Sequence, residues 1–89
     1  MANLYQIYIS PKKGILQSQV EEKMNLAVDW YRLHDSVWVV ETTSDAAKWQ
    51  TRLRPLVVPD GVLFICKLDT SDRQGWMPKK YWEWIKAKS

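Results

Sequence analysis

Apolar residues follow two different spacings in the first third of the chain. Residues 4–10 carry a large apolar side chain at every second position, a pattern that predicts a half-buried strand. These positions are Tyr5, Ile7 and Ile9. Over residues 15–28 the spacing becomes helical, which predicts an amphipathic helix. The residues expected on its inward face are Leu16, Val20, Met24 and Ala27 or Val28.

The middle of the chain, from Trp30 to Thr42, is rich in β-branched and aromatic residues. Residues 30–34 and 37–42 each have the length and composition of a short strand. Asp35-Ser36 between them has the length of a tight turn. This stretch therefore predicts a β-hairpin.

A second helix is expected over residues 45–54. Thr43 or Ser44 can cap its start, and Pro55 and Pro59 are expected to end it. Its predicted inward residues are Ala46, Trp49 and Leu53.

Residues 62–68 form a nearly continuous apolar run, which is typical of a central strand buried on both faces. Cys66, the single cysteine, is then expected to be a buried and inert thiol. A catalytic pair with His34, the single histidine, would require the two residues to lie on neighbouring strands.

The last pattern is a short helix over residues 78–88, with Pro78 in its first turn. Its inward residues are Trp82 and Ile85, or Tyr81 and Trp84. The order of elements predicts one ferredoxin-like α+β domain over residues 1–89, with a four-stranded antiparallel sheet and two helices on one face. The other face must be polar, covered by a partner, or covered by the terminal helix. Its candidate residues are Tyr8, Trp30, Arg32, His34 and either Trp38 or Val37 and Val39.

The chain is small and aromatic, with 89 residues and six tryptophans. A monomer of this size buries only about 60% of the surface that its unfolded chain exposes, so a second copy would usefully cover spare aromatic surface. We therefore expect a two-fold homodimer. Its predicted interface residues are Trp76, Trp82 and Trp84.

The net charge of +3 is unevenly distributed: residues 1–66 are balanced, and the whole excess lies in residues 67–89. This distribution suits an anionic partner such as the backbone of DNA or RNA, although a solvated lysine-rich helix has the same composition. The expected phosphate contacts are Lys12, Lys13, Arg32, Arg52, Arg54, Lys79 and Lys80. No signal peptide or apolar stretch of transmembrane length is present, so no membrane association and a cytoplasmic location are expected.

Several stretches resemble the SinR-type small proteins, which are grouped with the Cas-two and VapD superfamily of ferredoxin-like proteins. The resemblance covers most of the chain. It is carried by residues 4–10, 35–40 and 63–68, and by Gly75-Trp76-Met77-Pro78 with Trp82 following. The resemblance implies a ferredoxin-like dimer in a CRISPR-associated or similar defence system.

Nucleases of that superfamily are similar in carrying an aspartate at the end of the first strand, typically after a tyrosine. Two such carboxylates across a dimer can hold a divalent metal that activates water. Here Tyr8 is followed by Ile9 and Ser10, and a serine hydroxyl is a poor replacement for a carboxylate. We therefore expect no catalytic residue, no metal site and no cofactor.

Three classes of function remain open. The first is a non-catalytic, nucleic-acid-associated dimer, favoured by the fold and the basic tail. The second is a protein-interaction module, such as one partner of a toxin–antitoxin pair, in which a tryptophan-rich surface binds protein. The third is a metal-dependent nuclease, which Ser10 opposes.

Overall fold

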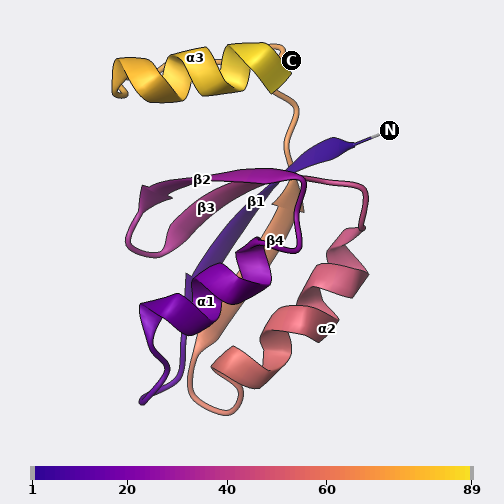
Figure 1. Ribbon diagram of the computed structural model, residues 1–89, viewed down its shortest axis with the longest axis vertical. Coiled ribbons are helices and arrows are strands. Elements are labelled where there is room, and N and C mark those ends of the chain that lie inside the picture. Colours follow the sequence, from indigo (N-terminus) through magenta and orange to yellow (C-terminus); the bar gives the residue numbers. More distant parts are fainter. Residues whose placement is uncertain (1, 89) are drawn as a thin grey trace.

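A computed structural model describes residues 2–88 and contains seven helices and strands (Figure 1). They are β1 (Asn3–Ser10), α1 (Gln17–Met24), β2 (Asp29–His34), β3 (Val37–Thr42), α2 (Ala46–Val57), β4 (Val62–Lys67) and α3 (Lys79–Lys88). The predicted order of elements is confirmed, and so is the hairpin across Asp35-Ser36. The protein has the ferredoxin-like α+β arrangement.

The four strands form one antiparallel sheet in the order β2-β3-β1-β4. The helices α1 and α2 lie against one face, and α3 lies against the other (Figure 1). The molecule therefore has three layers, and β2 and β4 form the two edges of the sheet.

The main core lies between the sheet and the pair α1 and α2. Ile7, Trp38 and Leu53 are almost completely buried there. Trp49 is also fully buried, and its Nε1–H donates to Thr42 Oγ1 at 3.1 Å. The predicted inward stripe of the second helix is thus confirmed.

A smaller core forms between the sheet and α3. Leu4, Val39 and Ile85 are its buried members. The residues packed around them are Leu33, Leu68, Tyr81, Trp82 and Trp84. The terminal helix is therefore what covers the second face of the sheet.

Two residues expected on that second face lie on the other one. Trp30 packs against the main core, and Arg32 stacks over the Trp38 ring at 5.1 Å. A register irregularity between Arg32 and His34 interrupts the alternation at the end of β2. The alternation of side chains along a strand shows which residues share a face, but it does not show which of the two faces lies against α1 and α2.

The bounds of α1 and α2 differ from the predicted ones. The first helix begins after Leu16, which is its N-cap, and stops at Met24 with Asn25 as its C-cap, so Leu16 and Val28 are exposed rather than inward. The second continues through Pro55 to Val57. Proline at this position removes one backbone donor, but the turn still closes because Val58 N–H donates to Arg54 O at 3.0 Å.

The prediction that residues 62–68 form a central strand was wrong. The strand β4 ends at Lys67 and pairs only with β1, at the edge of the sheet. Phe64 and Cys66 are consequently exposed, so the single thiol is not buried. An apolar run predicts a strand, but the order of strands in the sheet decides whether that strand is central or at an edge.

Candidate nucleic-acid interface

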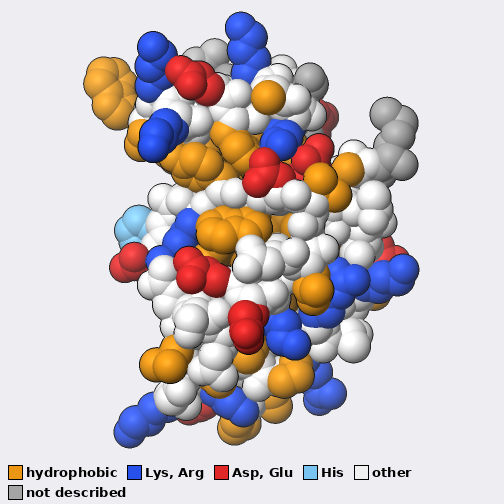
Figure 2. Space-filling view, in the orientation of Figure 1, with side chains coloured by type: hydrophobic (Ala, Val, Ile, Leu, Met, Phe, Trp, Pro, Cys, Tyr) orange, Lys and Arg blue, Asp and Glu red, His pale blue; other side chains and the backbone are white. Residues whose placement is uncertain are grey.

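All the charged residues of α2 are basic. The helix contains Lys48, Arg52 and Arg54 and no acidic residue within its bounds. Asp45 caps its start by accepting from the backbone N–H of Lys48 at 2.9 Å. Within residues 2–88 none of the three cationic side chains takes part in an ion pair. Figure 2 shows Lys and Arg side chains over α2 and, separately, over α3.

The loop after β1 is fastened to the end of α2. The backbone N–H of Lys12 donates to Leu56 O at 2.8 Å, and Gly14 supplies the positive φ of 92° that turns the loop. Lys12 and Arg54 consequently lie on one surface hollow, which Thr51, Pro55 and Val58 complete. Two basic residues that are far apart in the sequence are thus brought together.

The Arg52 side chain packs against a ring of its own helix. Its guanidinium lies 4.9 Å from the centre of the Trp49 ring. Its Nη1 is buried without a hydrogen-bond partner among the described residues. Arg52 is therefore largely a packing residue, and a smaller part of it is available to a ligand.

Arg32 belongs to a different part of the molecule. Its Nη2 donates to the backbone oxygen of Asp35 at 2.8 Å, while the Asp35 carboxylate is 3.9 Å away. It lines a small cavity of about 120 Å³ with Val20 and Trp38. Arg32 thus stabilises the turn of the hairpin and is not part of the basic surface of α2.

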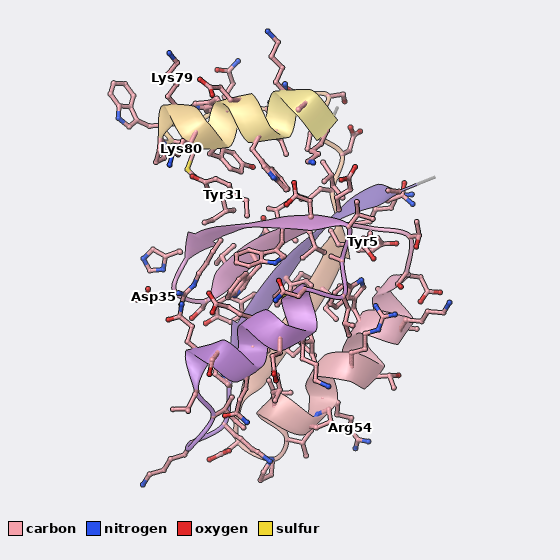
Figure 3. The ribbon with its side chains drawn as sticks, in the orientation of Figure 1. Tyr5, Tyr31, Asp35, Arg54, Lys79 and Lys80 are labelled. Carbon is pink, nitrogen blue, oxygen red and sulfur yellow. The ribbon has the colours of Figure 1, made fainter. Side chains whose placement is uncertain are left out.

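Lys79 and Lys80 lie at the start of α3, and Figure 3 places them at the opposite end of the molecule from Arg54. Lys79 forms an exposed contact of 3.9 Å with Glu83. The predicted phosphate contacts therefore do not form one continuous surface.

Part of the C-terminal charge is used to attach α3 to the sheet. Lys88 Nζ lies 2.8 Å from Asp29 Oδ2 and 3.3 Å from Glu41 Oε1. Trp84 Nε1–H donates to the same Asp29 oxygen at 3.0 Å. The hydrogen bond from Lys88 lowers the pKa of Asp29, and in return Asp29 raises the pKa of Lys88.

The three predicted interface tryptophans have different surroundings. Trp82 and Trp84 are half-buried and pack around Ile85 in the smaller core. Trp76 precedes α3 and is 100% exposed. Much of the expected aromatic surface is thus covered by the chain's own fold.

The residues considered for catalysis are scattered. Ser10 ends β1 opposite Val62. His34 and Cys66 lie on β2 and β4, the two opposite edges of the sheet, so they cannot act as a pair. Among residues 2–88, no three His, Cys, Asp or Glu side chains are close enough to hold a metal ion together.

Comparison with known proteins identifies no relative of this chain. No family model, no curated protein and no solved structure matches it significantly. None of the described helices is long and apolar enough to cross a membrane.

Sequence reasoning missed Lys48 as a member of the basic surface. A signal for it was available, because Lys48, Arg52 and Arg54 occur in one helix without an acidic residue. The association of Lys12 with this helix had no comparable signal, since it depends on a backbone hydrogen bond between distant segments.

Proposed function

We propose that this protein binds the phosphate backbone of DNA or RNA through α2 and the loop after β1, without hydrolysing it. The observation that carries the proposal is that Lys12 and Arg54 line the same surface hollow. Arg54 belongs to α2, whose charged residues are all basic. Cations without anionic neighbours remain free to replace the counterions of a nucleic acid.

The chemistry of this surface favours binding that is indifferent to base sequence. Lysine and arginine side chains on an exposed helix face act mainly as charges for phosphate groups, whereas base reading needs side chains placed in a groove. Binding should therefore be strongly salt-dependent.

We also propose that the protein belongs with the SinR-type small proteins of the Cas-two and VapD superfamily. Its ferredoxin-like fold and the turn at Asp35-Ser36 support this assignment. A cytoplasmic location agrees with an exposed, unpaired Cys66, because free thiols persist in reducing compartments.

The alternative of a protein-interaction module rests mainly on Trp76. This residue is the one large aromatic side chain in residues 2–88 that is fully exposed. Replacing Trp76 by alanine tests the alternative, since loss of a protein partner without loss of nucleic-acid binding would favour it.

The proposal is tested by titrating fluorescent single-stranded and duplex oligonucleotides at two salt concentrations. The double variant Lys12→Gln and Arg54→Gln should weaken binding and flatten the slope of log K against log salt by about 2, since each phosphate contact contributes about 0.9. The matched control is Lys79→Gln with Lys80→Gln, which changes the same charge at the far end of the molecule. Equal effects of the two doubles, or no binding by the wild type, would contradict the proposal.

Cleavage is measured on the same oligonucleotides with Mg²⁺ or Mn²⁺, comparing the wild type with Ser10→Ala. We expect no hydrolysis by either protein. Metal-dependent cleavage that disappears when Asp35 or Glu41 is neutralised would instead establish a nuclease.

A further inference from the structure

Two aromatic residues are neighbours on the face of the sheet that carries α3. Tyr8 of β1 is directly opposite Phe64 of β4, so both side chains project from the same face. Leu63 and Ile65 pack against the main core, which places Phe64 on the other face, that of α3. Tyr8 is 39% exposed and Phe64 is 63% exposed. The sheet therefore presents two adjacent aromatic side chains to solvent.

The terminal helix covers only one end of this face. Leu4 and Val39 are buried under α3. Tyr8 lies four residues beyond Leu4 on β1, which is about 14 Å along the strand at about 3.4 Å per residue. Val62 shares the face and is also exposed. The aromatic patch thus consists of Tyr8, Val62 and Phe64, and adjoining exposed apolar side chains of this kind mark a binding surface.

The strands that carry the aromatic patch contain no carboxylate. No residue of β1 is charged, and Lys67 is the one charged residue of β4. Asp60 and Asp69 lie beyond the two ends of β4. Asp35, in the hairpin turn, is in contact with Arg32 at 3.9 Å. A polyanion can therefore lie over the patch without meeting a carboxylate of these two strands.

Arg54 connects the aromatic patch to the basic surface. Arg54 and Phe64 both line a groove of about 430 Å³ between α2 and β4 (Figure 1). Arg54 also lines the hollow that contains Lys12, and Val58 lines both depressions, so the groove and the hollow adjoin. Because β4 is an edge strand, no other described strand lies outside it. A flexible polymer bound in the groove can cross this edge and reach the patch.

We propose that Tyr8 and Phe64 form a base-stacking site, on which unpaired bases lie while Lys12 and Arg54 hold the phosphates of the same strand. This inference rests on the proposed function. Aromatic rings beside a cationic groove are the combination with which proteins hold single strands, because every base has a face that can stack. A duplex keeps its base faces inside, so only unpaired bases can use these two rings.

Abasic oligonucleotides separate stacking from charge. They carry the same phosphates as a normal single strand but no bases. The wild type should bind a fluorescent normal single strand at least about fivefold more tightly than an abasic strand of equal length, which is the lower limit expected for one stacked base. Both strands should show the same dependence on salt, since their phosphate contacts are the same.

Substitutions of Phe64 identify the ring that carries the effect. Phe64→Leu keeps an apolar side chain but removes the ring, so it should weaken binding of the normal strand at least about fivefold. Its binding of abasic strands and of duplexes should be unchanged, whereas Phe64→Trp should bind the normal strand at least as tightly as the wild type. The double variant Tyr8→Leu and Phe64→Leu should bind normal and abasic strands equally. The matched control is Trp76→Ala, which removes a fully exposed ring outside the patch and should leave all affinities unchanged.

Equal binding of normal and abasic strands by the wild type would overturn the inference, and so would equal losses in Phe64→Leu and Trp76→Ala. If that equal binding is still weakened by Lys12→Gln with Arg54→Gln, the proposed function stands without the stacking site. If the wild type binds no nucleic acid, both are overturned. Loss of a protein partner in Phe64→Leu without any change in nucleic-acid binding would assign the patch to protein and would also refute base stacking.

Discussion

The two faces of the sheet are covered in different ways. The face under α1 and α2 is closed by a continuous core in which Trp38, Trp49 and Leu53 are almost completely buried. The face under α3 has three buried residues, a ring of half-buried aromatics and a cavity of about 370 Å³ beside Trp82. One face is thus covered by two helices with a full core, whereas the other is covered by a single helix that ion pairs of Lys88 help to attach.

This difference indicates that stability is not uniform across the molecule. Local opening is favoured where few apolar contacts hold an element in place. We therefore expect α3 to detach from the sheet at a lower free energy than is needed to unfold the four strands with α1 and α2.

The largest expected effect comes from truncating the main core. Trp49→Ala should destabilise the whole domain by about 3–5 kcal/mol, because it leaves a cavity and removes the hydrogen bond to Thr42. Chemical denaturation followed by circular dichroism measures this loss. Trp76→Ala, at a fully exposed position, is the matched control. If Trp49→Ala proves unfolded, Trp49→Phe should show a smaller but clear loss.

A smaller and local effect is expected from Ile85→Ala. This change removes the buried centre of α3 and should cost about 2–4 kcal/mol, mainly in the attachment of that helix. Hydrogen exchange should show amides of α3 losing protection while those of β1 keep theirs. Equal loss of protection in both elements would show that the two faces unfold together.

The attachment of α3 should also depend on pH. The pKa of Asp29 is lowered in the folded state, so its contribution is present above its unfolded pKa and is lost as pH falls below about 4. The pKa of Lys88 is raised, so its contribution is present at neutral pH and is lost as pH rises above about 10. Protease sensitivity of α3 should be lowest between these limits.

The variant Asp29→Asn separates this effect from general acid unfolding. It should increase protease sensitivity of α3 at neutral pH and remove much of the change near pH 4. Glu83→Gln on the exposed side of α3 is the control. An unchanged acid transition in Asp29→Asn would contradict the role of the ion pair.

The smallest effect is expected for the exposed pair Lys79 and Glu83. Their contact of 3.9 Å is largely solvated, so Glu83→Ala should change stability by no more than about 0.5 kcal/mol. Thermal unfolding at low and high salt measures the difference. A loss comparable to that of Ile85→Ala would show that charge, rather than burial, holds α3.

Much of the fold could be predicted because each element carries its own periodic signal. The hairpin and the stripe of Trp49 and Leu53 are examples, since short-range spacing alone identifies them. The edge position of β4 could not be predicted in this way. Its apolar run resembles that of a central strand, and only the pairing of β1 with both β3 and β4 reveals the edge.

The basic surface could be predicted in composition but not in arrangement. Charge counting identified Lys12, Arg54 and Lys79 together, although the first two share a hollow and the third lies at the far end. It also could not show that Lys88 is engaged by Asp29 and Glu41. Long-range contacts decide which charges remain available to a ligand.

The place of α3 in the chain has a consequence for folding. It follows all four strands in the sequence, and Leu4 and Val39 are exposed to water in any chain in which α3 has not yet docked. Such chains can associate through this apolar surface. The yield of folded protein should therefore fall as the protein concentration during refolding rises.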